Sequence, residues 1–184
     1  MSGHSKWSQI KRQKSVTDAA KSRIFARHAR LIAFESKKSH GNISDPLLAA
    51  AITRAKAANM PKDNIERAIA KGISKDSGNV EHSMYEAYGP AGVAILIDAF
   101  TDNKNRTTQE LKHLLLIHGI EIAPPGSAQW AFTKINGLYT PNEPLIEIVG
   151  DDENRFTEIL EALDEHDDIQ NIFTNARGYE NLGD

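Results

Sequence analysis

The chain has 184 residues, of which 40% are hydrophobic and 26% charged, a composition typical of a soluble globular protein with one large or two small domains. It contains no cysteine, which excludes disulfides, thiolate metal sites and cysteine nucleophiles. No apolar run approaches the roughly 20 residues needed to cross a bilayer. The basic N-terminus lacks the apolar segment of a secretory signal, so we expect a cytoplasmic protein.

The net charge of −3 conceals an asymmetry between the two halves of the chain. Residues 1–79 carry 16 lysines and arginines against 6 acidic residues, a net charge of +10, whereas residues 80–184 have a net charge of −13. Such a split indicates two domains with different partners, and the basic half favours a nucleic acid. The alternative is that the two halves only attract each other within the molecule.

The positive charge is most concentrated in Ser2–Lys38. Residues 2–14 are polar and basic without apolar periodicity, and they predict an arm that carries Trp7. A helix is expected at about residues 17–39, with a basic arc opposite an apolar arc that is formed by Ile24, Phe25, His28, Leu31 and Ile32. Members of the basic arc are Arg23, Arg27, Arg30, Lys37 and Lys38. Phe34 falls within this basic arc, where we expect it to pack on a neighbouring helix.

Two further helices are expected before residue 73. Asp45 as N-cap and Pro46 as the first helical residue begin a helix at 45–59, and another at 61–71 stops at Gly72. The three helices predict a small bundle, which we assign to a domain at residues 1–77. The polar stretch Ile73–His82 has no periodicity and is the expected linker.

From Met84 onward the pattern changes from helices to strands. Thr107 and Glu110 form a capping box at the start of one helix, and Asp151 opens a second helix, whose core face is Phe156, Ile159, Leu160 and Leu163. The expected strands are Met84–Tyr88, Val93–Thr101, Ala128–Lys134, Leu145–Val149 and Asn171–Asn175. This order predicts a ferredoxin-like α/β sandwich at residues 78–184, and an α+β class for the whole chain.

Five segments between residues 3 and 132 together resemble a known family. They are GHSKWSQIKRQK at 3–14, AANMPKDNIERAI at 57–69, YEAYGPAGVAILI at 85–97, TDNKNRT at 101–107 and GSAQWAF at 126–132. The chain resembles the YebC/PmpR family, which includes the mitochondrial translational activators of cytochrome oxidase. The resemblance implies nucleic-acid-linked control of gene expression without established catalytic residues. Members are labelled DNA-binding transcriptional regulators, and others look like translation factors that act on ribosomes stalled at proline-rich sequence.

The chain departs from the family pattern after the strand that contains Gly126–Phe132. In the family, a third domain is inserted into the second domain at this point. This sequence instead passes from Lys134 to Pro144 almost directly. The resemblance therefore implies a short form in which the inserted domain is absent near residues 135–144.

Lysine and arginine side chains neutralise phosphates, and an exposed tryptophan can stack on an unpaired base. We therefore expect nucleic acid to bind the basic N-terminal residues Lys6, Trp7, Lys11, Arg12, Lys14, Lys21, Arg23, Arg27 and Arg30. The alternatives are a solvated basic face and a Trp7 that packs on the bundle. A helix-turn-helix made by residues 45–59 and 61–71 could present Lys62, Asn64, Arg67 and Lys71 to a groove of DNA. Simple packing of these two helices within the bundle is the favoured interpretation.

A second candidate binding site is the TDNKNRT segment between a strand and a helix N-terminus. Backbone N–H groups at such a position favour an anion, and Lys104, Asn105 and Arg106 could reach a phosphate. Of these, we expect Asn105 and Arg106 to bind it. The alternative is a turn followed by a helix cap, in which Asp102 and Asn103 are turn residues and Thr107 is the cap.

No pattern in the chain predicts a metal site, a cofactor or a catalytic group. The histidines are scattered, and the acidic clusters at 151–153 and 164–168 are typical of helix ends and solvated faces. The favoured hypothesis is a non-enzymatic regulator that contacts structured RNA on the ribosome and assists translation of proline-rich sequence. A DNA-binding transcriptional regulator and a protein-interaction adaptor are the alternatives. We expect neither a membrane nor a small-molecule substrate as a partner, and a monomer is compatible with the sequence.

Overall fold

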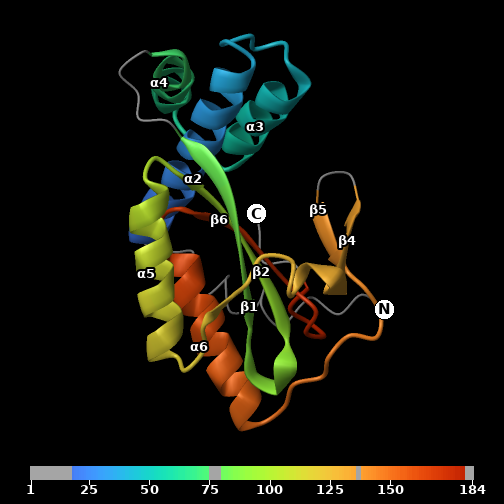
Figure 1. Cartoon of the computed structure of the whole chain (residues 1–184). Coiled ribbons are helices and arrows are strands. Elements are labelled where there is room, and N and C mark those ends of the chain that lie inside the picture. The colour runs from blue at the N-terminus through green and yellow to red at the C-terminus, as the bar shows by residue number, and fades with distance from the viewer. Residues whose placement is uncertain (1–17, 75–79, 136–137, 181–184) are drawn as a thin grey trace. The chain divides into compact units, whose positions relative to one another are not determined.

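The computed structural model describes residues 18–74, 80–135 and 138–180 (Figure 1). The arm expected at residues 2–14 lies outside the described residues. The described chain divides into two compact units, which we call the helical unit and the sheet unit. The helical unit contains the described residues from Asp18 to Ser83 together with Phe100–Lys104, and the sheet unit contains Met84–Ala99 and the described residues from Asn105 onward.

The helical unit consists of α2 (Asp18–Lys38), α3 (Pro46–Ala57) and α4 (Lys62–Ile73) (Figure 1). The predicted start of α3 is confirmed: the Asp45 carboxylate accepts hydrogen bonds from the backbone N–H groups of Leu47 and Leu48 at 2.9 and 3.2 Å, and Pro46 is the first helical residue. The three helices close around a common apolar core, whose fully buried members include Ile32, Leu48, Ala51 and Ala55.

Helices α2 and α4 approach each other closely near their C-terminal halves. Gly72 makes this possible, because a Cβ at that position would lie 2.4 Å from the backbone oxygen of Ala33 and 2.7 Å from the Cβ of Ser36. The buried Ser36 hydroxyl also donates a hydrogen bond of 2.8 Å to the backbone oxygen of Ile69. The absence of a side chain at Gly72 therefore sets the distance between the two helices.

Burial along α2 extends beyond the predicted apolar arc. His28, Leu31 and Ile32 are buried as expected, but Arg27, which was placed on the basic arc, is only 6% exposed. The reason is that α2 is packed by both α3 and α4, so that a wider arc is covered than a single apolar stripe. Phe34 packs against the apolar core of the helical unit, and its ring also lies edge-on against Phe100 at the end of a strand, with ring centroids 4.8 Å apart.

The sheet is built from β1 (Glu81–Tyr88), β2 (Ala94–Thr101), β3 (Ile122–Ala123) and β6 (Ile169–Thr174), in the order β3-β1-β2-β6. The pairs β1–β3 and β2–β6 are antiparallel. Helices α5 (Lys104–Ile117) and α6 (Asp151–Glu165) lie side by side on one face (Figure 1). The predicted core face of α6 is confirmed, since its four members are all 0% exposed. Three helices followed by an antiparallel sheet with helices confirm the predicted α+β class.

The opposite face of the sheet carries a second, smaller sheet made by β4 (Phe132–Ile135) and β5 (Leu138–Pro141) (Figure 1). Its core includes Leu96, Phe132 and Phe173. A buried carboxylate, Glu86, anchors the loop that leads into this hairpin. It accepts hydrogen bonds from the backbone N–H groups of residues 126, 128 and 129 at 2.6, 2.6 and 3.0 Å, so three loop donors are satisfied by one side chain.

Several predicted elements of the sheet unit are corrected. The strand expected at Ala128–Lys134 begins instead with a 3-10 turn, η2 (Gln129–Ala131), and becomes extended only at Phe132. The strand expected at Leu145–Val149 is reduced to one parallel bridge between Ile146 and Ala176. The short strands β3 and β5 were not predicted.

The predicted capping box is also wrong. Helix α5 begins at Lys104, so Thr107 lies inside it, and its buried hydroxyl donates a 2.6 Å hydrogen bond to the Asp168 carboxylate. Among the described residues, no helix is both long and apolar enough to cross a membrane.

Candidate nucleic-acid interface

A groove of about 430 Å³ runs between α2 and α4 within the helical unit. It exists because the face of α2 that lines it carries only small side chains at Ala26, Ala29 and Ala33, which recur at the three- and four-residue spacing of one helical face. Ala68 lies opposite on α4, and Phe25, Met60 and Val80 complete the apolar lining. Four alanine methyl groups leave open the space that larger side chains would occupy between the helices.

Positively charged side chains line the same groove from both helices. Arg30 comes from α2, whereas Arg67 and Lys71, one turn apart, come from α4. Asp102 is the one carboxylate among the lining residues that the structure describes. The groove therefore combines an apolar floor with a net positive rim.

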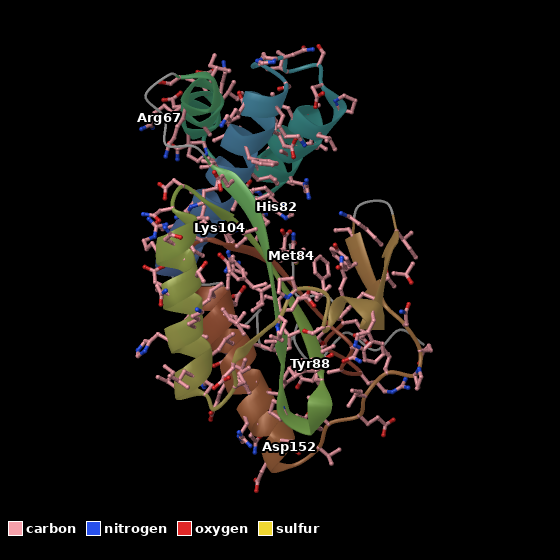
Figure 2. The ribbon with its side chains drawn as sticks, in the orientation of Figure 1. Arg67, His82, Met84, Tyr88, Lys104 and Asp152 are labelled. Atoms are coloured by element: carbon pink, nitrogen blue, oxygen red, sulfur yellow. The ribbon has the colours of Figure 1, made fainter. Side chains whose placement is uncertain are left out.

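The guanidinium of Arg67 is positioned without being neutralised by its two hydrogen bonds. Its Nε donates to the backbone oxygen of Asp63 at 3.2 Å, and its Nη2 donates to the Oδ1 atom of Asn64 at 2.7 Å. Both acceptors are neutral groups of the same helix. A guanidinium has five N–H donors, so three remain beyond these two bonds for an anion. Arg67 is exposed and projects from α4 (Figure 2).

The structure distributes the predicted binding residues unevenly. Arg30 lines the groove, Lys21 is exposed, Arg23 is partly buried and Arg27 is buried. The other five predicted residues of the basic N-terminus lie outside the described residues: Lys6, Trp7, Lys11, Arg12 and Lys14. Nucleic-acid binding by any of these residues stays a prediction.

At the second predicted site, Asn105 is exposed, and Arg106 is engaged inside the sheet unit. The Nη2 atom of Arg106 lies 2.7 Å from a carboxylate oxygen of Asp168, whose side chain is only 2% exposed. The hydroxyl of Thr107 donates to the same oxygen at 2.6 Å. This guanidinium therefore fastens the first turn of α5 to the segment that precedes β6. Its contact with a phosphate stays a prediction, and such a contact would have to compete with the ion pair to the buried Asp168 carboxylate.

Near Arg106, three side chains of types that bind metal ions come within 4.8 Å of one another: Glu110, His166 and Asp168. The Nε2 atom of His166 lies 3.1 Å from the Oε2 atom of Glu110, and the Nε atom of Arg106 lies 3.8 Å from the same oxygen. The Arg106 guanidinium thus already pairs with the carboxylates of both Glu110 and Asp168, and a metal ion would have to displace it.

From the sequence, Arg67 and Lys71 are expected only as DNA-contacting residues of a helix-turn-helix, and no pattern predicts that they line a groove with Arg30. A usable signal was present in the chain. Three alanines at helical spacing on one helix and Gly72 on another are typical of two helices that cross closely. Basic residues that flank such a small-residue face are then expected to line any groove that remains between the two helices.

Two family models match the chain in order. The TACO1/YebC protein N-terminal domain matches residues 5–75, and the TACO1/YebC second and third domain matches residues 80–143. In the solved structures, a conserved hypothetical protein, Aq1575 from Aquifex aeolicus, superposes with a TM-score of 0.84 at 26% sequence identity. That match covers 93% of this chain and 96% of the Aquifex chain.

Curated relatives carry the name "Probable transcriptional regulatory protein". The relative from Thermosipho africanus is 48% identical over 79% of this chain and 58% of its own length. The relative from Petrotoga mobilis is 42% identical over 95% of this chain and 70% of its own length. This chain spans between 54% and 58% of the length of the first four relatives.

A relative from Pelotomaculum thermopropionicum is 34% identical over 239 aligned positions, which cover 95% of this chain and 98% of the relative. The alignment is longer than the 184 residues of this chain, so the relative contains residues that this chain lacks. The predicted resemblance is confirmed by the two family models and by relatives at 34–48% identity. This chain belongs to the TACO1/YebC family.

Proposed function

We propose that this protein is a non-enzymatic regulator of gene expression that contacts structured RNA on the ribosome through its helical unit. The observation that supports this proposal most directly is the rim of the α2–α4 groove, where Arg30, Arg67 and Lys71 come together from two helices. The names of the relatives are those of regulatory proteins, which is compatible with a role that involves no catalysis.

Phosphates of folded RNA are the ligands that suit this rim. A guanidinium recognises a phosphate through two parallel N–H donors, and Arg67 has its orientation set by its own helix before any ligand arrives. Cations from two crossing helices can contact phosphates that are separated in space, which favours the shape of a folded RNA over a base sequence. The basic arm at residues 2–14 adds further phosphate contacts in this proposal.

The proposed role in translation is based on the family resemblance. We infer that the protein assists translation of difficult, proline-rich sequence, and that the acidic sheet unit orients the helical unit or contacts a protein. We also propose that residues 1–77 and 78–184 act as the two functional domains, with the family's inserted domain absent near residues 135–144. The pairing of Ile135 with Leu138 supports this, because only two residues separate β4 from β5.

A matched pair of double variants tests the proposal. Arg67→Gln with Lys71→Gln removes an arginine and a lysine from the groove, whereas Arg54→Gln with Lys56→Gln removes an exposed arginine and lysine from α3. We expect the first double variant to lower the slope of log affinity for ribosomal RNA against log salt by about 2, because each lost phosphate contact contributes about 1. The second should change the slope little. Equal slopes for both variants would contradict a role for the groove.

Ribosome co-sedimentation tests the arm and the ribosomal target. Replacing Lys11, Arg12 and Lys14 together by Glu reverses three charges, and we expect the protein to leave the ribosomal fraction at physiological salt. Co-sedimentation that is unchanged by this reversal would contradict the ribosomal form of the proposal. The measurement should use intact ribosomes and the full chain, because both the arm and the groove are proposed to contribute.

The second candidate function is a DNA-binding transcriptional regulator, which the names of the relatives favour. Duplex DNA also offers phosphates to a cationic rim, so binding alone does not separate the two functions. The discriminating quantity is the ratio of affinities for a promoter duplex and a random duplex at physiological salt. Sequence-specific regulators reach ratios of roughly 10³ or more, and a ratio near one would argue against this function.

A further inference from the structure

Beneath its cationic rim, the α2–α4 groove has a lining that phosphate binding does not require. Ala26, Ala29 and Ala33 present methyl groups to the groove, and Phe25 and Met60 add larger apolar surface. Phosphates and hydrated sugars gain nothing from such a floor. Its volume of about 430 Å³ falls within the range of roughly 300–1,000 Å³ that is usual for pockets that enclose small molecules.

We propose that the groove encloses a single unpaired base of the bound RNA, while Arg30, Arg67 and Lys71 contact the phosphates on either side of it. This inference rests on the proposed function and specifies its ligand: an RNA with an extruded nucleotide. A nucleobase has flat apolar faces with polar edges, and unpaired bases are what proteins read in folded RNA. The groove offers the matching combination of an apolar floor, a polar edge and positive charge.

Polar groups at the groove edge fit the rim of a base. Asn64 is partly buried, and its Oδ1 atom accepts the hydrogen bond from Arg67 at 2.7 Å. That bond fixes the amide orientation and directs the NH₂ group as a donor toward other acceptors. A directed donor beside an apolar floor suits a base better than an aliphatic chain, which has no polar edge.

The probes for this inference are two synthetic RNA hairpins that differ only in one bulged adenosine. The full chain should bind the bulged hairpin about tenfold more tightly than the fully paired one, a factor within the range for stacking of one base on a protein surface. A fluorescent 2-aminopurine in place of the bulged adenosine should change its emission on binding, because the base leaves water.

A groove-filling variant separates the floor from the rim. Ala29→Leu places an isobutyl group in the groove without altering any charge, and Ala26→Leu provides a second variant at a neighbouring position should the first fail to fold. We expect either substitution to abolish the preference for the bulged hairpin and to weaken binding to the paired hairpin far less than Arg67→Gln with Lys71→Gln does. Arg67→Gln with Lys71→Gln should instead weaken binding to both hairpins by similar factors.

The outcomes distinguish this inference from the proposed function. Equal wild-type affinity for the two hairpins, or a tenfold preference that survives Ala29→Leu, would overturn base insertion while RNA binding stands. Absence of binding to both hairpins and to ribosomal RNA would overturn the proposed function itself. Equal hairpin affinities, combined with loss of ribosome co-sedimentation in Ala29→Leu, would also overturn the inference, because the groove would then bind something other than a bulged base.

Discussion

Two exposed arginines, one in each unit, have opposite surroundings. Arg106 in the sheet unit lies 2.7 Å from the carboxylate of Asp168, which is buried, whereas Arg67 in the helical unit is held by a backbone oxygen and an amide oxygen of its own helix. A carboxylate partner neutralises a guanidinium, but neutral acceptors only orient it. The charge of Arg106 therefore contributes to the fold, whereas the acceptors of Arg67 are neutral, which is why we propose that Arg67 contacts RNA.

The two units also contain different supports that can be tested. In the sheet unit, the buried Glu86 carboxylate accepts hydrogen bonds from three backbone N–H groups of one loop, and the Asp168 carboxylate accepts from both Arg106 and Thr107. In the helical unit, the supports include apolar packing, the close contact at Gly72 and the cap at Asp45. Each of these supports can be removed separately, and the expected losses differ in size.

The largest expected loss follows from removing the Glu86 carboxylate. Glu86→Ala leaves three backbone N–H groups without their acceptor in a site where the residue is 5% exposed, and we expect unfolding to become easier by about 3–5 kcal/mol. Denaturant unfolding of the purified variant measures this. Glu147→Ala, which removes a mostly exposed carboxylate paired with Arg177 at 3.3 Å, is the control and should change stability by less than about 1 kcal/mol. Similar losses for both variants would show that the Glu86 hydrogen bonds do not stabilise the sheet unit.

A smaller loss is expected from Gly72→Ala in the helical unit. The added methyl group would meet the backbone oxygen of Ala33 at 2.4 Å, and the helices must separate to relieve the overlap. Overpacking of this kind costs about 1–3 kcal/mol, against which alanine gains up to about 1 kcal/mol in helix propensity. We expect a net loss of about 1–2 kcal/mol in denaturant unfolding, while Ala70→Ser on the exposed side of α4 changes little. A Gly72→Ala variant more stable than the wild type would contradict the close crossing of α2 and α4.

The smallest expected effect concerns the cap of α3. Asp45→Ala removes the acceptor of the hydrogen bonds from the N–H groups of Leu47 and Leu48, and N-caps of this type contribute about 1 kcal/mol. Asp45→Asn retains a side-chain oxygen and should restore most of that stability. Circular dichroism during thermal unfolding can compare the three proteins, and a loss that Asn does not restore would assign the effect to the charge rather than to the cap.

Much of the fold could be predicted because it depends on local pattern. The apolar period of α6 gave its core face, and Asp45 followed by Pro46 gave the start of α3. Other features depend on residues distant in sequence. Thr107 and Glu110 satisfied the local pattern of a capping box, but Asp168, which is 61 residues away, accepts the Thr107 hydroxyl inside α5. Strand β3 has only two residues, too few for any periodicity.

The candidate site was harder to predict than the fold for a related reason. Charge along the chain identified Arg30, and it favoured Arg106 because that residue lies between a strand and a helix. The sequence suggests Arg67 only as a residue that contacts DNA. The groove beside Arg67 forms because α2 and α4 carry small side chains there, and small side chains give no binding signal in a sequence. The small side chains of Ala26, Ala29 and Ala33 are recognisable as the floor of a groove only once the close crossing of α2 and α4 at Gly72 is known.

The central claim, that Arg67 binds RNA while Arg106 stabilises the fold, is tested most directly by measuring both properties on two single variants. Arg106→Ala should lower the free energy of unfolding by about 1–2 kcal/mol, less than for a fully buried pair because its own side chain is 43% exposed, and it should leave affinity for ribosomal RNA unchanged. Arg67→Ala should change stability by less than about 0.5 kcal/mol and weaken RNA binding several-fold. Weaker RNA binding in Arg106→Ala, with unchanged binding in Arg67→Ala, would contradict the account.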